Sequence, residues 1–93
     1  MIKVTKKGNK AWVTFTLQPE YNVQNASLVG EWNDWQYESM KQKKNGEFYM
    51  TKILQHSNEY EFRYVINQDE WTNEPQTATI ANPYGSSNSL LQI

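Results

Sequence analysis

The sequence predicts an all-β protein, folded as a sandwich or a barrel, on three observations. Apolar and polar residues alternate with a period of two in the longest strand-like segments, residues 11–17 and 60–66. Turn-forming residues recur at short intervals between such segments. No window has the apolar spacing of an amphipathic helix, and no internal repeat or linker divides the 93 residues. We therefore expect one domain over residues 1–93.

The segment AWVTFTL, residues 11–17, is expected to be a strand with one buried face. Val13, Phe15 and Leu17 fall on its apolar side, whereas Trp12 belongs to the opposite side. The aromatic and β-branched residues of this segment favour a strand over a helix.

Turns are expected between the strands, and two of them have the composition of β-hairpin turns. Gly8-Asn9 and Asn45-Gly46 are pairs that accept positive φ angles. The segment NSLLQI, residues 88–93, is expected to be the closing strand. The other turn signals are Pro19-Glu20, Asn33-Asp34, Ser57-Asn58, Asn67 to Glu70, Asn82-Pro83 and Gly85.

The segment LVGEWNDWQYESM, residues 28–40, places two tryptophans around an Asn-Asp turn. If Leu28 points inward, Gly30 and Trp32 share its parity. Trp32 is therefore expected in the core. The alternation ends at the Asn-Asp turn, so it does not predict whether the Trp35 side chain points inward or outward.

The segment YEFRYVI, residues 60–66, is expected to be a half-buried strand with Phe62 inside and Arg63 outside. The polar turn NQDE follows, and Trp71 comes directly after it. Trp35 and Trp71 thus both lie beside polar turns. From the pattern alone, each could close an open end of the sandwich or form a stacking surface for a sugar ring. Arg63 could be a solvated charge or a partner for sugar hydroxyls.

The composition excludes several classes of protein. Nine Lys/Arg against ten Asp/Glu give a formal charge of −1, which argues against nucleic acid or an anionic membrane as a partner held by bulk charge. The absence of cysteine excludes a disulfide framework and thiolate metal sites. A content of 14% aromatic residues is too high for a disordered chain. The first residues lack the apolar core of a signal peptide, so a cytoplasmic location is expected.

Residues for catalysis or for a cofactor are mostly missing. His56 is the only histidine, and it lies in a polar turn, so neither a zinc site nor a nucleophilic triad can be assembled. The glycines are scattered singly, which excludes a phosphate-binding loop. We expect no enzyme activity, no metal and no cofactor. The paired carboxylates, which are expected to be exposed and ionised, are Asp69-Glu70 and Glu59-Glu61.

Six motifs in order resemble those of the family 48 carbohydrate-binding modules, over Val13 to Ile93. This family includes the glycogen-binding domain of the AMP-activated protein kinase beta subunit and the N-terminal modules of glucan branching and debranching enzymes. The motifs are VTFTL (13–17), LVGEWNDW (28–35), GEF (46–48), YEFRYVI (60–66), EWTNEP (70–75) and YGSSNSLLQI (84–93).

The resemblance implies an immunoglobulin-like, early-set antiparallel β-sandwich that binds α-1,4-linked glucans such as glycogen. It implies that Trp35 and Trp71 are sugar-stacking surfaces and that Trp32 is the family's buried aromatic residue. It further implies that Arg63, in place of the kinase module's lysine, and Asn88 are partners for sugar hydroxyls.

The chain departs from the family at three places. The turn NQDE before Trp71 has no glycine and is one residue longer than the usual Asp-Gly turn. Tyr84 takes the position of a leucine that threads the sugar ring in the kinase module. It could add a third stacking face or block a cyclic glucan, and both outcomes stay open. Glu74 replaces the aspartate that usually precedes the proline.

The resulting hypothesis is non-catalytic binding of an α-glucan polysaccharide or oligosaccharide at Trp35, Arg63, Trp71, Tyr84 and Asn88. The expected partners are therefore glucans, and neither nucleic acid nor a membrane. Two alternatives remain: a protein-interaction sandwich that has lost sugar binding, and an accessory domain of a glucan-processing enzyme. Either alternative would add a protein partner.

Overall fold

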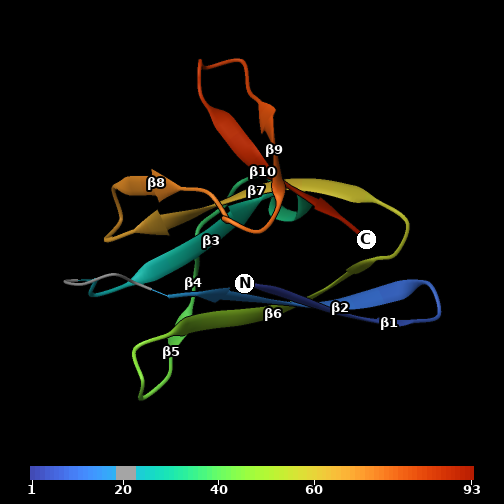
Figure 1. Ribbon diagram of the computed structural model, residues 1–93, viewed down its shortest axis with the longest axis horizontal. Coiled ribbons are helices and arrows are strands. Elements are labelled where there is room, and N and C mark those ends of the chain that lie inside the picture. The colour runs from blue at the N-terminus through green and yellow to red at the C-terminus, as the bar shows by residue number, and fades with distance from the viewer. Residues whose placement is uncertain (19–22) are drawn as a thin grey trace.

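The computed structural model describes residues 1–18 and 23–93, and the predicted turn at Pro19-Glu20 lies outside them. Two antiparallel sheets pack face to face, which confirms the predicted all-β, immunoglobulin-like sandwich (Figure 1). The four-stranded sheet has the order β1 (Ile2–Lys7), β2 (Lys10–Leu17), β6 (Phe48–Gln55) and β5 (Lys41–Gln42). The six-stranded sheet has the order β4 (Glu38–Ser39), β3 (Ala26–Gly30), β7 (Glu59–Ile66), β10 (Ser87–Gln92) and β9 (Ala78–Ala81), and β8 (Glu70–Thr72) also pairs with β7.

The predicted alternation of β2 and β7 is confirmed, because it produces the core between the sheets. Val13 and Phe15 of β2 are fully buried, as are Phe62 and Tyr64 of β7. The rings of Phe15 and Phe62 meet edge to face, with their centroids 5.1 Å apart. Trp12 points to the outer face and is 37% exposed.

Trp32 packs against this core, as predicted, from the short 3-10 helix η1 (Glu31–Asn33) that follows β3. Its ring centroid lies 5.4 Å from that of Phe15 and 6.1 Å from that of Phe62. The ring also covers the backbone of Gly30, whose absent side chain makes this close approach possible. A Cβ atom on Gly30 would lie 2.6 Å from the Trp32 ring.

We expect the substitution Gly30→Ala to lower the free energy of unfolding by roughly 1–3 kcal/mol, because the added methyl group displaces Trp32. The φ angle of Gly30 is −166°, which alanine adopts readily, so the loss comes from the contact alone. Urea unfolding of Gly30→Ala, Trp32→Phe and the double variant measures the loss in the free energy of unfolding. The two losses should add up to more than the loss in the double variant. Strictly additive losses would contradict a clash between the added methyl group and the Trp32 ring as the cause.

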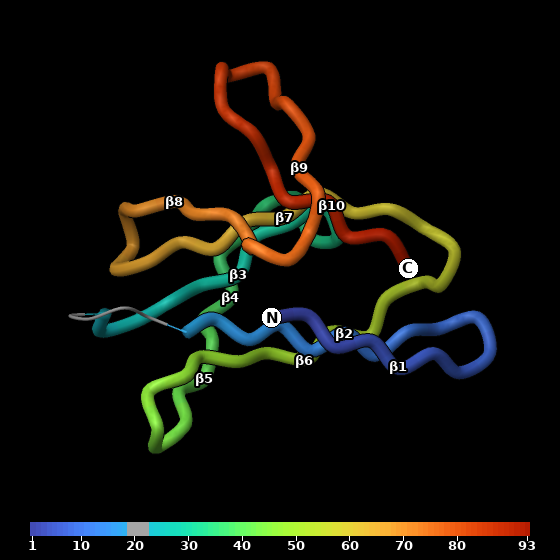
Figure 2. The backbone as a smooth tube through the Cα atoms, viewed as in Figure 1, coloured from blue at the N-terminus to red at the C-terminus, as the bar shows by residue number. Residues whose placement is uncertain are grey.

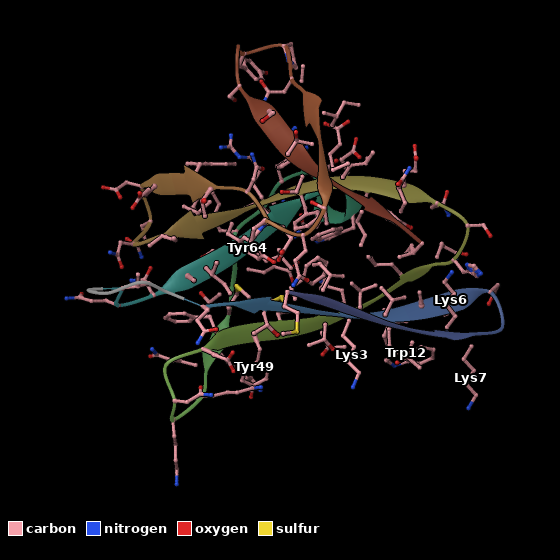
Figure 3. All side chains as sticks on the ribbon, in the orientation of Figure 1. Lys3, Lys6, Lys7, Trp12, Tyr49 and Tyr64 are labelled. Atoms are coloured by element: carbon pink, nitrogen blue, oxygen red, sulfur yellow. The ribbon has the colours of Figure 1, made fainter. Side chains whose placement is uncertain are left out.

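The edge of the four-stranded sheet that β1 forms is positively charged. Lys3, Lys6 and Lys7 lie on β1, which is the outermost strand of this sheet. Figure 3 shows Lys3 and Lys7 pointing to the outer side of the sheet together with Trp12. Lysines on an edge strand oppose pairing with a strand from another molecule. The charge on β1 thus disfavours edge-to-edge pairing through this strand.

The segment that follows β8 is fixed by a buried carboxylate, that of Glu74. Its Oε1 accepts hydrogen bonds from the Tyr64 hydroxyl at 2.8 Å and from the amino group of Met1 at 2.7 Å. Its Oε2 accepts the backbone N–H of Gln76 at 2.9 Å. Burial, and then the nearby Glu74 carboxylate, raise the pKa of Tyr64 far above its ordinary value, so the phenol stays protonated and keeps donating.

Two projections on the six-stranded sheet frame its outer face. The β7–β8 hairpin extends at one end, and the β9–β10 hairpin rises away from the sandwich (Figure 2). None of the described residues forms a helix long and apolar enough to cross a membrane.

Candidate functional site

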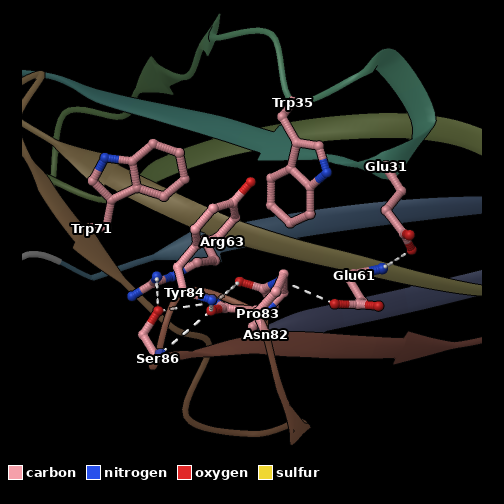
Figure 4. Close-up of a pocket in the computed structure, with 10 residues that line it drawn as sticks. Glu31, Trp35, Glu61, Arg63, Trp71, Asn82, Pro83, Tyr84 and Ser86 are labelled. Carbon is pink, nitrogen blue, oxygen red and sulfur yellow. Dashed lines mark hydrogen bonds between the residues drawn. The ribbon is translucent and has the colours of Figure 1, made fainter.

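A hollow of about 580 Å³ lies on the outer face of the six-stranded sheet (Figure 4). We call it the groove. All five residues predicted for the site line it, although they come from five separate segments of the chain. The groove is lined by Glu31, Trp35, Glu61, Arg63, Trp71, Asn82, Pro83, Tyr84, Ser86 and Asn88.

Trp35 is positioned by the turn after η1. Asp34 and Trp35 have φ angles of 60° and 62°, which are unusual for residues other than glycine. The turn is closed by the Trp35 N–H, which donates to the Gly30 carbonyl at 2.9 Å. The Asn33 side chain supports it by donating to Glu38 Oε1 at 2.7 Å. This left-handed backbone turns the half-buried Trp35 toward the groove, whereas Trp32 turns toward the core.

Trp71 is positioned by the β7–β8 turn, which forms without the glycine that the family usually has. Asn67 and Gln68 adopt positive φ angles of 51° and 69°, and the Asp69 N–H donates to the Ile66 carbonyl at 3.2 Å. The longer turn therefore still brings Trp71 to the groove.

Trp71 is 40% exposed, and two other side chains contact its ring. The Tyr37 ring meets it edge to face, with the centroids 6.0 Å apart. The Arg63 guanidinium carbon lies 5.6 Å from its centroid, a cation–π distance. Because β8 pairs Trp71 with Val65, the tryptophan stands on the same sheet face as Arg63, two residues earlier on β7.

Arg63 has unused hydrogen-bond donors. Its Nη1 contacts Ser86 Oγ at 3.4 Å, and its buried Nε has no partner among the described residues. A guanidinium carries five N–H donors, so this side chain can serve a ligand in the groove.

Tyr84 is at the tip of the β9–β10 loop and is 91% exposed. The loop is shaped by Asn82, whose Oδ1 accepts the backbone N–H groups of Tyr84 at 2.9 Å and Ser86 at 3.3 Å. The Asn82 Nδ2 group also donates to Ser86 Oγ at 2.9 Å. In Figure 4, Tyr84 projects between Trp71 and Trp35. The groove therefore has three aromatic side chains in its wall.

Asn88 belongs to a hydrogen-bonded chain in the floor of the groove. Its side chain is largely buried; Nδ2 donates to Glu61 Oε1 at 2.9 Å, and Oδ1 accepts from Asn82 Nδ2 at 3.1 Å. Glu31 Oε1 in turn accepts the backbone N–H of Glu61 at 2.7 Å. Asn88 keeps one further N–H for a ligand.

Five further lining residues were not predicted from the sequence: Glu31, Glu61, Asn82, Pro83 and Ser86. The outward parity of Glu61 beside Arg63 was the one available signal, since both residues alternate with the buried Phe62. No local sequence pattern predicts the hydrogen bond from the Glu61 N–H to Glu31, because it joins residues 30 positions apart.

The groove combines flat aromatic faces with donors and acceptors at their margins. Aromatic faces contact the C–H groups of a sugar ring, while side-chain amides, carboxylates and a guanidinium bond its hydroxyls. Among the described residues, no group of three or more His, Asp or Glu side chains is placed to hold a metal ion. Sandwich and groove together define a carbohydrate-binding module.

The comparison with protein families identifies which module this is. Residues 13–93 match the family described as the glycogen recognition site of AMP-activated protein kinase, and the chain belongs to this family. The family is a non-catalytic carbohydrate-binding domain. A search of curated proteins finds no match.

Proposed function

We propose that the protein binds α-1,4-linked glucans, such as glycogen, starch and maltooligosaccharides, in the groove and leaves them chemically unchanged. The observation that carries this proposal is the convergence of Trp35 and Trp71 on one hollow. Both come from polar turns, and each could instead have closed an end of the sandwich. The family match to a glycogen recognition site supports the same conclusion.

The roles follow from the placement of each side chain. Trp35 and Trp71 stack on successive glucose units, and Tyr84 adds a third aromatic face between them. Arg63 donates hydrogen bonds to hydroxyls near Trp71. Asn88 donates its remaining N–H from the floor of the groove.

The expected affinity is modest. Covering about half of each indole contributes roughly 2–3 kcal/mol per ring, and each hydroxyl hydrogen bond adds about 1 kcal/mol. The lost translational and rotational freedom offsets about 4 kcal/mol or more of this gain. We expect dissociation constants between high micromolar and millimolar for short maltooligosaccharides, and tighter apparent binding to polymers with repeated sites.

Titration with maltoheptaose tests the proposal. We expect the tryptophan fluorescence to change and to saturate in the high-micromolar to millimolar range, because the sugar covers Trp35 and Trp71. Cellohexaose, whose β-1,4 linkages give a straighter chain, is the matched control and should bind far more weakly. Unchanged fluorescence at millimolar maltoheptaose, together with no retardation by glycogen in a native gel, would contradict the proposal. It would favour the protein-interaction alternative.

A further inference from the structure

The charged side chains of the groove are divided between its two ends. Arg63 lies with Trp71 and Ser86, whereas Glu31 and Glu61 lie on the side of Trp35 (Figure 4). Two carboxylates against one guanidinium leave the lining with one net negative charge. The Trp35 end of the groove is therefore acidic.

The Glu61 carboxylate is held in one position. Asn88 donates to its Oε1 at 2.9 Å, and Asn88 is itself fixed by Asn82 at 3.1 Å. The backbone N–H of Glu61 is bonded to Glu31 at 2.7 Å, which also brings the second carboxylate close. The Glu61 Oε2 atom, in contrast, accepts no hydrogen bond from the described side chains or backbone.

An ionised carboxylate oxygen can only accept hydrogen bonds. At the Trp35 end it matches a sugar hydroxyl, which donates. It does not match a phosphate, sulfate or carboxylate substituent, which brings no donor and carries a like charge.

We infer that Glu61 is a specificity-determining residue, which selects neutral glucans and disfavours glucans that carry an anionic group such as a phosphate monoester. Asn88 and Asn82 act as positioning residues for this carboxylate. The inference rests on the proposed function and adds the chemical class of glucan that the groove accepts.

The test compares maltoheptaose with maltoheptaose that carries one phosphate monoester on O6, by calorimetric titration of the full chain at low ionic strength. We expect the unmodified protein to bind the phosphorylated sugar about five- to tenfold more weakly, because like charges repel at short range. Raising the salt concentration should lower the ratio of the two dissociation constants (phosphorylated to unmodified sugar), since salt screens the repulsion. In Glu61→Gln the ratio should fall to about twofold or less.

The substitution Glu59→Gln is the matched control. Glu59 lies on the same strand, is exposed, and bonds Gln92 at 2.7 Å outside the groove. Glu59→Gln changes the net charge of the protein by the same amount as Glu61→Gln. It should leave the ratio of the two dissociation constants unchanged.

Three outcomes would overturn the inference, and they differ in what else they affect. Equal affinities for the two sugars in the unmodified protein, or a ratio that neither Glu61→Gln nor salt alters, would remove the role of Glu61 and leave glucan binding intact. Failure of both sugars to bind the unmodified protein would overturn the inference and the proposed function together. The salt series on the unmodified protein tests the electrostatic origin of the difference even if Glu61→Gln folds poorly.

Discussion

Replacing Trp35 by alanine is expected to weaken maltoheptaose binding by about 30-fold or more, which for a module of modest affinity amounts to loss of measurable binding. The substitution removes the indole that covers one sugar ring. The fold should persist, because Trp35 is half-buried outside the core cluster and alanine tolerates its φ of 62° no worse than tryptophan does. Calorimetric titration measures the loss without relying on tryptophan fluorescence.

Trp12→Ala is the control for this prediction. Trp12 has an exposure of 37%, close to the 40% of Trp71, but it lies on the outer face of the other sheet. Its removal should leave the affinity for maltoheptaose within about twofold of the unmodified protein. Equal affinities of Trp35→Ala and the unmodified protein would show that Trp35 is not a sugar-stacking residue.

Replacing Phe62 by alanine should lower the free energy of unfolding by about 3–5 kcal/mol, a large share of the total stability of a small domain. Phe62 is fully buried at the centre of the sandwich. Its ring centroid lies 5.1 Å from that of Phe15 and 5.8 Å from that of Tyr64, and both contacts are edge to face. Alanine would leave a cavity among these rings. Urea unfolding followed by circular dichroism measures the change.

Ile53→Ala provides the comparison for Phe62→Ala. Ile53 is 55% exposed on the outer face of β6, so its loss should cost less than about 1 kcal/mol. A cost for Phe62→Ala no larger than that of Ile53→Ala would mean that the two sheets do not meet through this ring.

Much of the fold could be predicted from the sequence, because one parity of each long strand is packed between the sheets. The alternation in β2 and β7 correctly placed Phe15, Phe62 and Tyr64 in the core. It did not reveal that Val65, on the opposite parity, is also fully buried. Strand parity distinguishes the two faces of a sheet, but it does not show whether the outer face is covered. In this protein that face carries Trp71 directly opposite Val65.

The candidate site could be predicted in part. Trp35, Arg63, Trp71, Tyr84 and Asn88 were expected from the family resemblance, and all of them line the groove. The conformations that bring them there were not visible in the sequence, since the φ angles of Asp34 and Gln68 are positive without glycine. The carboxylates were missed for another reason: Glu31 and Glu61 are brought together by tertiary structure.

The Asn82 side chain shapes the β9–β10 loop through its bonds to the Tyr84 and Ser86 backbone, so this wall is formed before a sugar arrives. Its conformational entropy is lost when the protein folds and does not have to be lost again on binding. With ordinary association rates, a complex of modest affinity then lasts on the order of a millisecond. On the proposed function, the module would therefore hold a polysaccharide through many brief encounters and not through one long-lived complex.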